Sequence, residues 1–376
     1  MIKGFKVRLE PNNKQNTILF KCAGTSRFIY NWTLAKQEEN YKNGAKFIND
    51  GILRKELTQL KKGELHWLNE VSNNVAKQSV KDACDAYKRF FKGQAKHPRF
   101  KSKKKSTPSF YNDVLKIKFN ETHVRLEKIG WIKLSEYNRI PFGDDIKYMN
   151  PRITHDGLNW YISVNIEVEN IKPILSNASI GIDLGIKDLA IVSNIDKPFK
   201  NINKTHKVKK IKKRMRKLQR QISRKYEMNR SGKKYIKTNN IIKLEYKYNK
   251  LQKHLNFIRE DYIQKVTTKI VKTKPSRVVM EDLNVNGMMK NRHLSKAIQK
   301  QCLYRFITIM KYKCEKYGIE FIQADRWYPS SKTCSCCGNI KAKLSLSERE
   351  YICDKCGLKI DRDKNASINL SRYKAS

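Results

Sequence analysis

The segment SIGIDLGIKDLAIVS, from Ser179 to Ser193, decides the fold class of this chain. Residues 180–185 of this segment form a short, largely apolar run that predicts a buried strand, and residues 189–193 can pair back with that strand as a hairpin. Helical and strand-like runs then alternate, at residues 206–270, 276–280, 294–317 and 319–323. Strands that alternate with helices in this way indicate an α/β sheet.

Asp183 lies within the first of these strands. Side chains alternate between the two faces of a strand, so Ile182 and Leu184 face the core and Asp183 faces the other way. Its neighbours on that face are two glycines, Gly181 and Gly185. We therefore expect open space beside this carboxylate for a metal ion or a phosphate.

Two further acids lie where they could join Asp183. Glu281 ends the strand at 276–280, and α/β folds place their functional sites at such strand ends. Asp363 begins a short helix at 363–372 that can pack on the sheet with this carboxylate at the edge. Three carboxylates from separate elements suit a two-metal phosphodiester site, since hard oxygen ligands hold Mg²⁺. Each acid also has a structural interpretation: Asp183 as a turn former, Glu281 as a solvated strand end and Asp363 as a helix N-cap.

Five of the nine cysteines lie between residues 334 and 356. Two pairs have the spacing of a four-thiolate zinc site, and the predicted ligands are Cys334, Cys337, Cys353 and Cys356. Cys336 offers an additional thiol, but symmetry with the second pair favours Cys337. Gly338 and Gly357 each follow a pair, at a position where a positive φ is often needed. A closed four-cysteine site is structural rather than catalytic.

The first half of the chain has a different pattern. Residues 2–9 predict a strand, and a helical pattern runs from about 13 to 96. A basic stretch at 98–105 is followed by a sequence pattern typical of strands from about 107 to 170, in which Asp156-Gly157 is a good hairpin turn. We expect a small antiparallel barrel that takes residues 2–9 as its first strand, with the helical segment inserted.

The charge of the chain is its most unusual property. It contains 81 Lys and Arg against 35 Asp and Glu, a formal net charge of +46. Residues 201–250 alone hold 19 Lys and Arg and 2 Glu. So much like charge repels itself within a compact fold, which indicates a polyanionic partner. The sequence has no apolar run of ~18–20 residues and no signal-peptide core, and its clustered cysteines favour a reducing compartment, so we expect a cytoplasmic protein without a membrane partner.

Four motifs resemble, in their order, those of the transposon-encoded TnpB proteins, which are compact relatives of the type V CRISPR nucleases. They are Gly181-Ile182-Asp183-Leu184-Gly185-Ile186, Val279-Met280-Glu281-Asp282-Leu283, Trp327-Tyr328-Pro329-Ser330-Ser331-Lys332-Thr333-Cys334 with the paired cysteines, and Asp361-Arg362-Asp363-Lys364-Asn365-Ala366. The resemblance covers nearly the whole chain and includes the helical start around Arg27–Trp32. The first hundred residues match more loosely than the rest.

The resemblance implies a multidomain α/β, β-barrel and helical architecture. Its parts are a RuvC-type nuclease domain of RNase H-like fold, a zinc ribbon inserted in that domain, an antiparallel wedge barrel and an inserted helical recognition domain. The implied boundaries are 1–10 for the first barrel strand, 11–97 for the recognition domain, 98–175 for the rest of the barrel, 176–326 for the nuclease domain with its long basic helical insertion, 327–358 for the zinc ribbon and 359–376 for the last nuclease segment.

The resemblance also implies RNA-guided cleavage of both strands of DNA, beside a short adjacent motif. The guide RNA would come from the transposon end, and double-stranded target DNA would be the second partner. Asp183, Glu281 and Asp363 would be the catalytic ligands of two Mg²⁺ (or Mn²⁺) ions, with Asp361 ordering the turn. Zn²⁺ on the four cysteines would be structural.

The basic residues would bind the nucleic acids. Those implied to contact nucleic-acid backbones are Arg99, Lys101, Lys103, Lys104, Lys105, Lys209, Lys210, Lys212, Lys213, Arg214 and Arg216. Three alternatives stay open at this point. A transposase can also use three acids, a nuclease-inactive RNA-guided repressor would keep the fold without the chemistry, and a zinc-ribbon RNA-binding protein would need no acids at strand ends.

Overall fold

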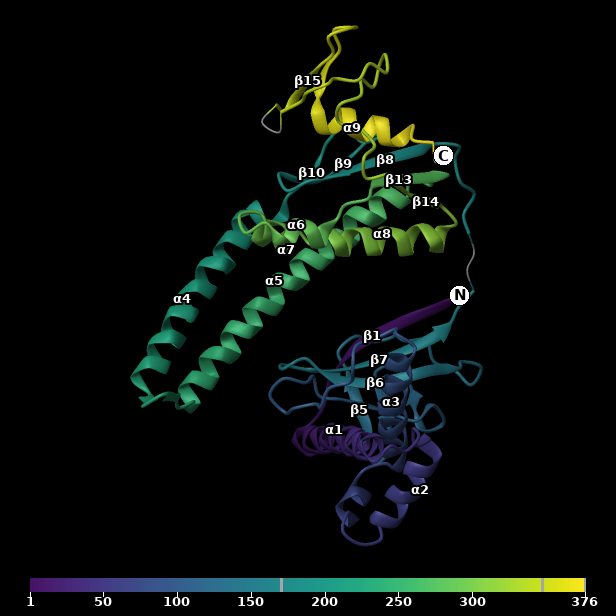
Figure 1. The fold of residues 1–376 in the computed structure, drawn as a ribbon, viewed down its shortest axis with the longest axis vertical. Helices are drawn as coiled ribbons and strands as arrows, with labels where there is room; N and C mark the ends of the chain where they lie inside the picture. Colours follow the sequence, from purple (N-terminus) through teal and green to yellow (C-terminus); the bar gives the residue numbers. More distant parts are fainter. Residues whose placement is uncertain (170–171, 346–347, 375–376) are drawn as a thin grey trace. The chain divides into compact units, whose positions relative to one another are not determined.

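The computed structural model describes residues 1–169, 172–345 and 348–374. The chain forms two compact units, residues 1–169 and 170–376, and each contains a sheet with its own hydrophobic core (Figure 1). Among the described residues, no helix has the length and apolarity needed to cross a membrane.

The first unit is built on a seven-stranded antiparallel sheet with the order β2-β6-β7-β1-β5-β4-β3. The strands are β1 (Ile2–Glu10), β2 (Ser109–Tyr111), β3 (Lys118–Phe119), β4 (His123–Leu126), β5 (Gly130–Leu134), β6 (Tyr148–His155) and β7 (Trp160–Glu167). The predicted strand at 2–9 is confirmed as β1, which pairs with β7 from Ile2 to Leu9. The predicted turn at Asp156-Gly157 joins β6 to β7, with Gly157 at φ +90°. Residues far apart in sequence therefore share one sheet, and the helices are inserted between its strands.

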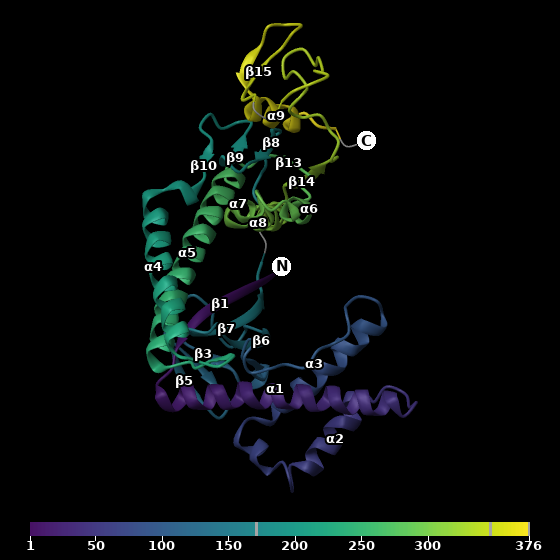
Figure 2. The same ribbon diagram turned by 60° about the vertical axis from the view of Figure 1, so that its left-hand side comes forward.

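The inserted segment is helical, as predicted. Its helices are α1 (Asn13–Lys42), α2 (Asp50–Leu60) and α3 (Asn73–Phe91), with short 3-10 turns at η1 (His66–Glu70) and, beyond the helices, η2 (Val114–Lys116). Asn12 starts α1 through a capping box with Gln15, which satisfies backbone groups that the first turn leaves unpaired. The buried hydroxyl of Ser79 in α3 lies 2.9 Å from that of Ser26 in α1. Figure 2 shows α1 between the sheet and α2.

The second unit contains a five-stranded mixed sheet with the order β10-β9-β8-β13-β14. The strands are β8 (Ser179–Leu184), β9 (Asp188–Val192), β10 (Phe199–Lys200), β13 (Arg277–Glu281) and β14 (Glu320–Ala324). β8 and β9 form the predicted hairpin, while β8, β13 and β14 are parallel. The expected α/β sheet is confirmed.

Helices cover both faces of this sheet. The helices of this unit are α4 (His206–Met228), α5 (Asn239–Val271), α6 (Val285–Lys290), α7 (Ser295–Gln301), α8 (Leu303–Tyr317) and α9 (Arg362–Ser371), with a short turn η3 (Ile202–Lys204). Of these, α4 packs on α5 rather than on the sheet. The core on one face joins α5 and α8 to Val278 and Met280 of β13. On the other face Leu370 of α9 packs with Val279 and Ala324. The sheet thus lies between α8 and α9, as Figure 1 shows.

One helical prediction needs correction, and another gains detail. The helix expected at 294–317 is interrupted at Cys302, which adopts a left-handed conformation with φ 58° and separates α7 from α8. The helical region expected at 206–270 is confirmed and consists of α4 and α5, which are joined by a small ribbon of β11 (Arg230–Ser231) and β12 (Lys234–Tyr235). Gly232 makes that turn at φ +56°.

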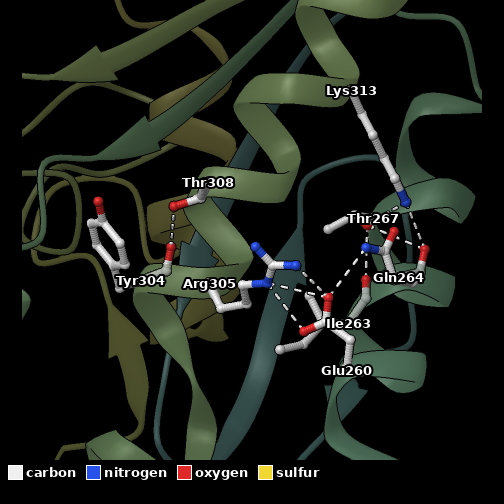
Figure 3. Close-up of polar contacts among 8 residues, drawn as sticks. All are labelled: Glu260, Ile263, Gln264, Thr267, Tyr304, Arg305, Thr308 and Lys313. Carbon is white, nitrogen blue, oxygen red and sulfur yellow. Dashed lines mark hydrogen bonds and ion pairs between the residues drawn. The ribbon is translucent and has the colours of Figure 1, made fainter. Parts of the chain in front are cut away.

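Polar contacts fix α8 on α5 (Figure 3). Arg305 of α8 forms an ion pair with Glu260 of α5 at 2.7 Å. Lys313 donates hydrogen bonds of 2.7 Å to the hydroxyls of Thr267 and Thr268. Burial lowers the pKa of Lys313 to about 8, because a charged ammonium loses hydration there. These contacts hold the two helices together beneath the sheet.

Candidate active site and cysteine cluster

The backbone of α9 lies directly against β8 at Gly181. A β-carbon at this position would clash with the carbonyl oxygen of Ser367 and the amide nitrogen of Ser371. Two residues earlier in the strand, the Ser179 hydroxyl donates a 2.6 Å hydrogen bond to the carbonyl oxygen of Ser371. The open space expected beside Asp183 at Gly181 is therefore wrong, because α9 fills it. Glycine is required here for a close helix–strand approach.

This contact fixes where Asp363 lies. Two residues of a strand advance about 6.6 Å, and four residues of a helix advance about 6 Å. Every second residue of β8 therefore lies beside every fourth residue of α9. Ser371 lies at Ser179, and Ser367 lies at Gly181. The next step along both elements brings Asp363, in the first turn of α9, to Asp183.

Glu281 reaches the same place through the sheet register. Parallel pairing sets Val279 beside Gly181 and Met280 beside Ile182. One residue further, Glu281 is level with Asp183 and on the same face, since neighbouring residues in register share a face. The carboxylates of Asp183, Glu281 and Asp363 thus converge where β8 and β13 end and α9 begins.

Electrostatics show that the three acids interact. The pKa of Asp183 lies well above its usual range, first because of burial and then because of repulsion from Glu281 and Asp363, while Arg362 acts in the opposite direction. A cluster of carboxylates in a partly buried site favours a bound cation, because the cation offsets both desolvation and repulsion. The oxygen-only donor set is the kind that Mg²⁺ prefers.

Asp361, not Asp363, caps the last helix. The Asp361 carboxylate accepts hydrogen bonds of 3.0 Å from the backbone N–H groups of Asp363 and Lys364. The N-cap interpretation of Asp363 is therefore wrong, and the expectation that Asp361 orders the turn is confirmed. Because Asp361 satisfies the helix start, the side chain of Asp363 is available to the acid cluster.

Lys364 anchors the same turn from the other side. Its ammonium donates hydrogen bonds of 2.9–3.0 Å to the carbonyl oxygens of Val192, Ser193 and Ile195, at the end of β9. Burial lowers its pKa. The first turn of α9 is therefore tied to the β8–β9 hairpin that carries Asp183.

A second set of contacts joins α9 to the segment before the cysteines. The Ser330 hydroxyl donates to Glu281 Oε1 at 2.6 Å, and the Ser330 carbonyl accepts from Asn369 Nδ2 at 2.8 Å. The buried amide of Asn365 donates to Thr333 O at 2.7 Å and accepts from the N–H of Ser335 at 3.0 Å. One continuous network therefore links Glu281, α9 and the backbone on both sides of Cys334.

Sequence reasoning missed these polar residues. Asn365 and Asn369 lie four positions apart, one helical turn, on the face that carries the buried Ala366 and Leu370. Two asparagines at that spacing beside apolar residues were the available signal, since buried amides must find hydrogen-bond partners. The same spacing of asparagines also occurs on solvated helix faces, so the sequence distinguishes the two cases only if the packing of α9 on the sheet is known.

The four predicted cysteines form one cluster. Their sulfur atoms all lie within 4.8 Å of one another, and this is the one group of three or more His, Cys, Asp or Glu side chains in residues 1–169, 172–345 and 348–374 that meets this limit. The Cys334–Cys356 and Cys337–Cys353 sulfur pairs are each 3.6 Å apart. Tetrahedral zinc with bonds of about 2.3 Å places its sulfurs about 3.8 Å apart, so the cluster fits Zn²⁺. Cys336 stays outside the cluster.

The two cysteine pairs have matching local structure. Gly338 and Gly357 adopt φ +74° and +68°, as predicted. A two-stranded ribbon of β15 (Glu350–Ile352) and β16 (Lys359–Asp361) flanks the second pair, and β16 leads directly into α9. The cluster is therefore connected to Asp363 by only a few residues of chain.

The basic stretch 98–105 is only partly available for binding. Arg99, Lys103, Lys104 and Lys105 are exposed. Lys101 turns inward instead, and its ammonium lies 3.6 Å from the centre of the Tyr30 ring. Burial lowers the pKa of Lys101. The expectation that Lys101 contacts a nucleic-acid backbone is not supported by this position.

On α4 the cationic side chains line one hollow of about 1170 Å³. Among the predicted residues, those lining it are Lys209, Lys210, Lys213, Arg214 and Arg216. Lys212 instead donates to the carbonyl oxygen of Asn203 at 3.3 Å, and burial lowers its pKa to about 8. Lys212 therefore faces the body of the unit, whereas the other five form a cationic helix face.

Comparison with known proteins identifies the family. A Streptomyces pristinaespiralis protein named as an RNA-guided DNA endonuclease is 30% identical over 98% of this chain and 88% of its own length. The chain belongs to the TnpB family. An Escherichia coli K12 relative with the same designation is 29% identical over 98% of the chain and 91% of its own length. The resemblance found in the motifs is thereby confirmed.

Three domain families match parts of this TnpB chain. They are described as "Cas12f1-like, TNB domain" at residues 304–370, "Probable transposase" at 161–292 and "Helix-turn-helix domain" at 1–46. Residues 1–46 here form β1 and the single long helix α1. The cryo-EM structure of a Cas12f1–sgRNA–target DNA complex shares the fold, with a TM-score of 0.59 at 14% identity over 99% of this chain and 98% of the other. This chain and Cas12f1 thus share a fold despite low sequence identity.

Proposed function

We propose that this TnpB protein is an RNA-guided DNA endonuclease that cleaves both strands of a target by metal-dependent phosphodiester hydrolysis. The observation that carries the proposal is the meeting of Asp183, Glu281 and Asp363 from two strands and a helix. The names of the relatives support RNA-guided DNA cleavage. The Cas12f1 complex, which shares the fold, is one with guide RNA and target DNA.

We further propose that residues 176–326 and 359–376 form a RuvC-type nuclease domain of RNase H-like fold, with a zinc ribbon at 327–358. The mixed sheet, with an acid at the ends of β8 and β13, supports this assignment. In the first unit, residues 1–10 and 98–175 would form the wedge barrel, and 11–97 the recognition domain. The antiparallel sheet with inserted helices supports that division.

Asp183, Glu281 and Asp363 would hold two Mg²⁺ ions, which supply a water activated for attack and charge stabilisation at the leaving oxygen. The protein holds these carboxylates in place. Ser330 orients Glu281, and the helix cap at Asp361 fixes the turn that carries Asp363. Zn²⁺ on the four cysteines would have a structural role, because all four tetrahedral positions are filled by protein sulfur.

The basic face of α4 would bind nucleic-acid backbones. Phosphates attract lysine and arginine irrespective of base sequence, so α4 would position a duplex rather than read it. Sequence recognition would come from pairing between the guide RNA and one DNA strand. This division of labour accounts for the formal net charge of +46.

The test is cleavage of a plasmid that carries a guide-matched site beside randomised flanking sequence. The protein is purified with its co-purifying RNA, which is sequenced to define the guide. We expect Mg²⁺-dependent cutting with the matched guide and none with a scrambled guide. Equal cutting with both guides would indicate a nonspecific nuclease, and guided binding without cutting would support the repressor alternative.

A further inference from the structure

A hollow of about 300 Å³ opens between the C-terminal ends of α1 and α3 in the first unit. Most of its lining is aromatic, from Tyr41, Phe47, Tyr87, Phe90, Phe91 and His97. The acids and the cysteine cluster belong to the other unit. Pockets of this size with aromatic walls and a few polar groups are typical of ligand sites, and nothing in the proposed cleavage reaction uses this one.

The walls of the hollow are held in place. The His97 ring packs edge-on against Tyr87 and Phe90, with ring centres 5.4 and 5.1 Å apart. Phe91 stacks on Tyr87 at 6.0 Å and meets Phe47 edge-on at 6.1 Å. The rings therefore support one another and do not need a ligand to order them.

Hydrogen bonds also hold the loop that carries Phe47 in place. Gln37 of α1 donates to the carbonyl oxygen of Ile48 at 2.7 Å and accepts from its N–H at 3.1 Å. Asn40 donates to the carbonyl oxygen of Lys46. The hollow is thus preformed, which lowers the entropic cost of filling it.

Among the Phe and Tyr residues of the lining, two remain open to a ligand. Phe91 is 58% exposed and Tyr41 is 75% exposed. Their rings offer flat apolar surface at the mouth of the hollow, whereas Tyr87 behind them is buried. A flat ring could stack on the exposed pair with little rearrangement.

The polar groups of the hollow determine which hydrogen-bonding groups such a ring should carry at its edge. Glu38 lines it, and the C-terminal ends of α1 and α3 add partial negative charge. The Tyr87 hydroxyl is buried and has no hydrogen-bond partner among the described residues. Carboxylate and helix ends accept hydrogen bonds and repel anions, so the interior suits N–H groups and not phosphate.

The rim has the opposite charge. Lys42 lines the hollow but is itself exposed, and Lys46, Lys92 and Lys96 are exposed in the segments beside it. Phosphates would therefore be attracted outside the hollow and excluded from its interior. A nucleotide within a nucleic-acid strand has both features, because its base is a flat ring with N–H donors and its phosphates can stay at the rim.

We propose that this hollow receives one unpaired nucleobase of a single-stranded nucleic acid bound by the protein. The inference rests on the proposed function, which supplies an RNA guide and a displaced DNA strand. Stacking on aromatic rings tolerates every base because each has a π-face. Glu38 would accept a hydrogen bond from an amino or imino group, as carboxylates do from cytosine.

The first test maps the contact directly. Single-stranded 12-nucleotide RNAs that carry 5-iodouracil or 5-iodocytosine at one position are irradiated with the full-length protein, and cross-linked residues are identified by mass spectrometry. We expect adducts on Tyr41, Phe91 or His97. Efficient cross-linking confined to residues outside the hollow would overturn the proposal.

The second test measures binding of the same RNAs by Phe91→Leu and Tyr41→Leu variants. Leucine keeps apolar bulk without a ring face, and the exposed Tyr137→Leu serves as the matched control. We expect the double variant to bind about tenfold more weakly, since stacking contributes ~1–3 kcal/mol per base. An abasic 12-mer should bind the wild type and the variants alike.

The outcomes separate the inference from the function on which it rests. If the double variant lost affinity equally for normal and abasic RNA, or lost affinity for neither, the nucleobase site would be overturned and the endonuclease proposal would stay intact. A wild-type protein that binds no RNA would instead contradict the proposed function. Unchanged thermal unfolding of the variants checks that a loss of binding is not a loss of fold.

Discussion

The hydroxyl of Ser330 donates a 2.6 Å hydrogen bond to the carboxylate of Glu281. Ser330 lies four residues before Cys334, and Asn369 of α9 binds its carbonyl oxygen at 2.8 Å. One short segment therefore contacts the carboxylate of one strand, the helix that carries Asp363 and the start of the cysteine cluster. The two proposed metal sites of the second unit are coupled through it.

Replacing Ser330 with alanine should weaken divalent-metal binding at the carboxylates. A hydrogen bond to a charged group contributes about 1.5–3 kcal/mol, so we expect the Mg²⁺ concentration for half-maximal cutting to rise roughly tenfold or more. Mn²⁺ binding measured by calorimetry on the uncut complex gives a readout independent of activity. Ser330→Thr should restore affinity, and the adjacent Ser331→Ala should not change it. Identical Mn²⁺ affinity in Ser330→Ala and wild type would contradict the positioning role.

The carboxylates themselves should be essential for cutting but not for binding. Asp183→Asn and Glu281→Gln keep the side-chain shape while removing the charge that holds a cation, so we expect cleavage to be abolished and target binding to be retained. Asp282→Asn is the matched control, because Asp282 follows Glu281 directly and forms an ion pair with Arg326 at 2.5 Å. Plasmid cleavage and gel-shift assays measure the two properties. Residual cutting by either acid variant would place the chemistry elsewhere.

The cysteine cluster should bind one zinc ion per chain. Serine at Cys334 or Cys353 should remove the metal and destabilise the second unit, since a structural zinc site contributes on the order of 10 kcal/mol of folding free energy. Cys336→Ser should keep the full zinc content because this thiol lies outside the cluster. Elemental analysis with thermal unfolding provides the measurement. Zinc loss in Cys336→Ser would show that the ligand set is wrong.

Charge on α4 should control salt dependence rather than sequence preference. Neutralising Lys209, Lys210 and Lys213 to glutamine should reduce the slope of log affinity against log salt by about 0.9 for each lost contact with B-form DNA. Lys212→Gln should leave the slope unchanged, because Lys212 faces away from the cationic side. Titrations of matched and unrelated duplexes at several salt concentrations test this. A loss confined to one target sequence would mean that α4 reads bases.

Gly181→Ala should destabilise the second unit. The added β-carbon would meet the backbone of Ser367 and Ser371 and force α9 away from β8, at a cost of about 1–3 kcal/mol for overpacking. Gly24→Ala is the control, since a β-carbon there has no atom within 4 Å and the residue lies inside α1. That change should be neutral or stabilising because alanine favours helix. Denaturant unfolding compares the two, and equal stabilities would argue against the close contact.

Local patterns in the sequence predict much of this structure. β8, β9, β13 and β14 follow from short β-branched runs, and the four clustered cysteines follow from their spacing. These features depend on neighbours within a few residues. The alternation rule also places Asp183 on the correct face of its strand.

Contacts between distant segments could not be predicted in the same way. The role of Gly181 depends on α9, which lies near the other end of the described chain. Lys101 and Lys212 belong to basic runs, but packing against Tyr30 and the Asn203 carbonyl turns them inward. Cys302 breaks a helix without a glycine or proline to mark the site. Each of these outcomes is decided by tertiary packing.

The position of α9 in the chain has a consequence for protein synthesis. A ribosome completes β8 and β13, with Asp183 and Glu281, long before it reaches the residues of α9. Until then the sheet face at Gly181 has no cover and the acid cluster lacks Asp363. A polypeptide released early by a stop codon or a stalled ribosome therefore carries two of the three acids, and the cell that makes such a fragment is protected from the proposed cutting activity.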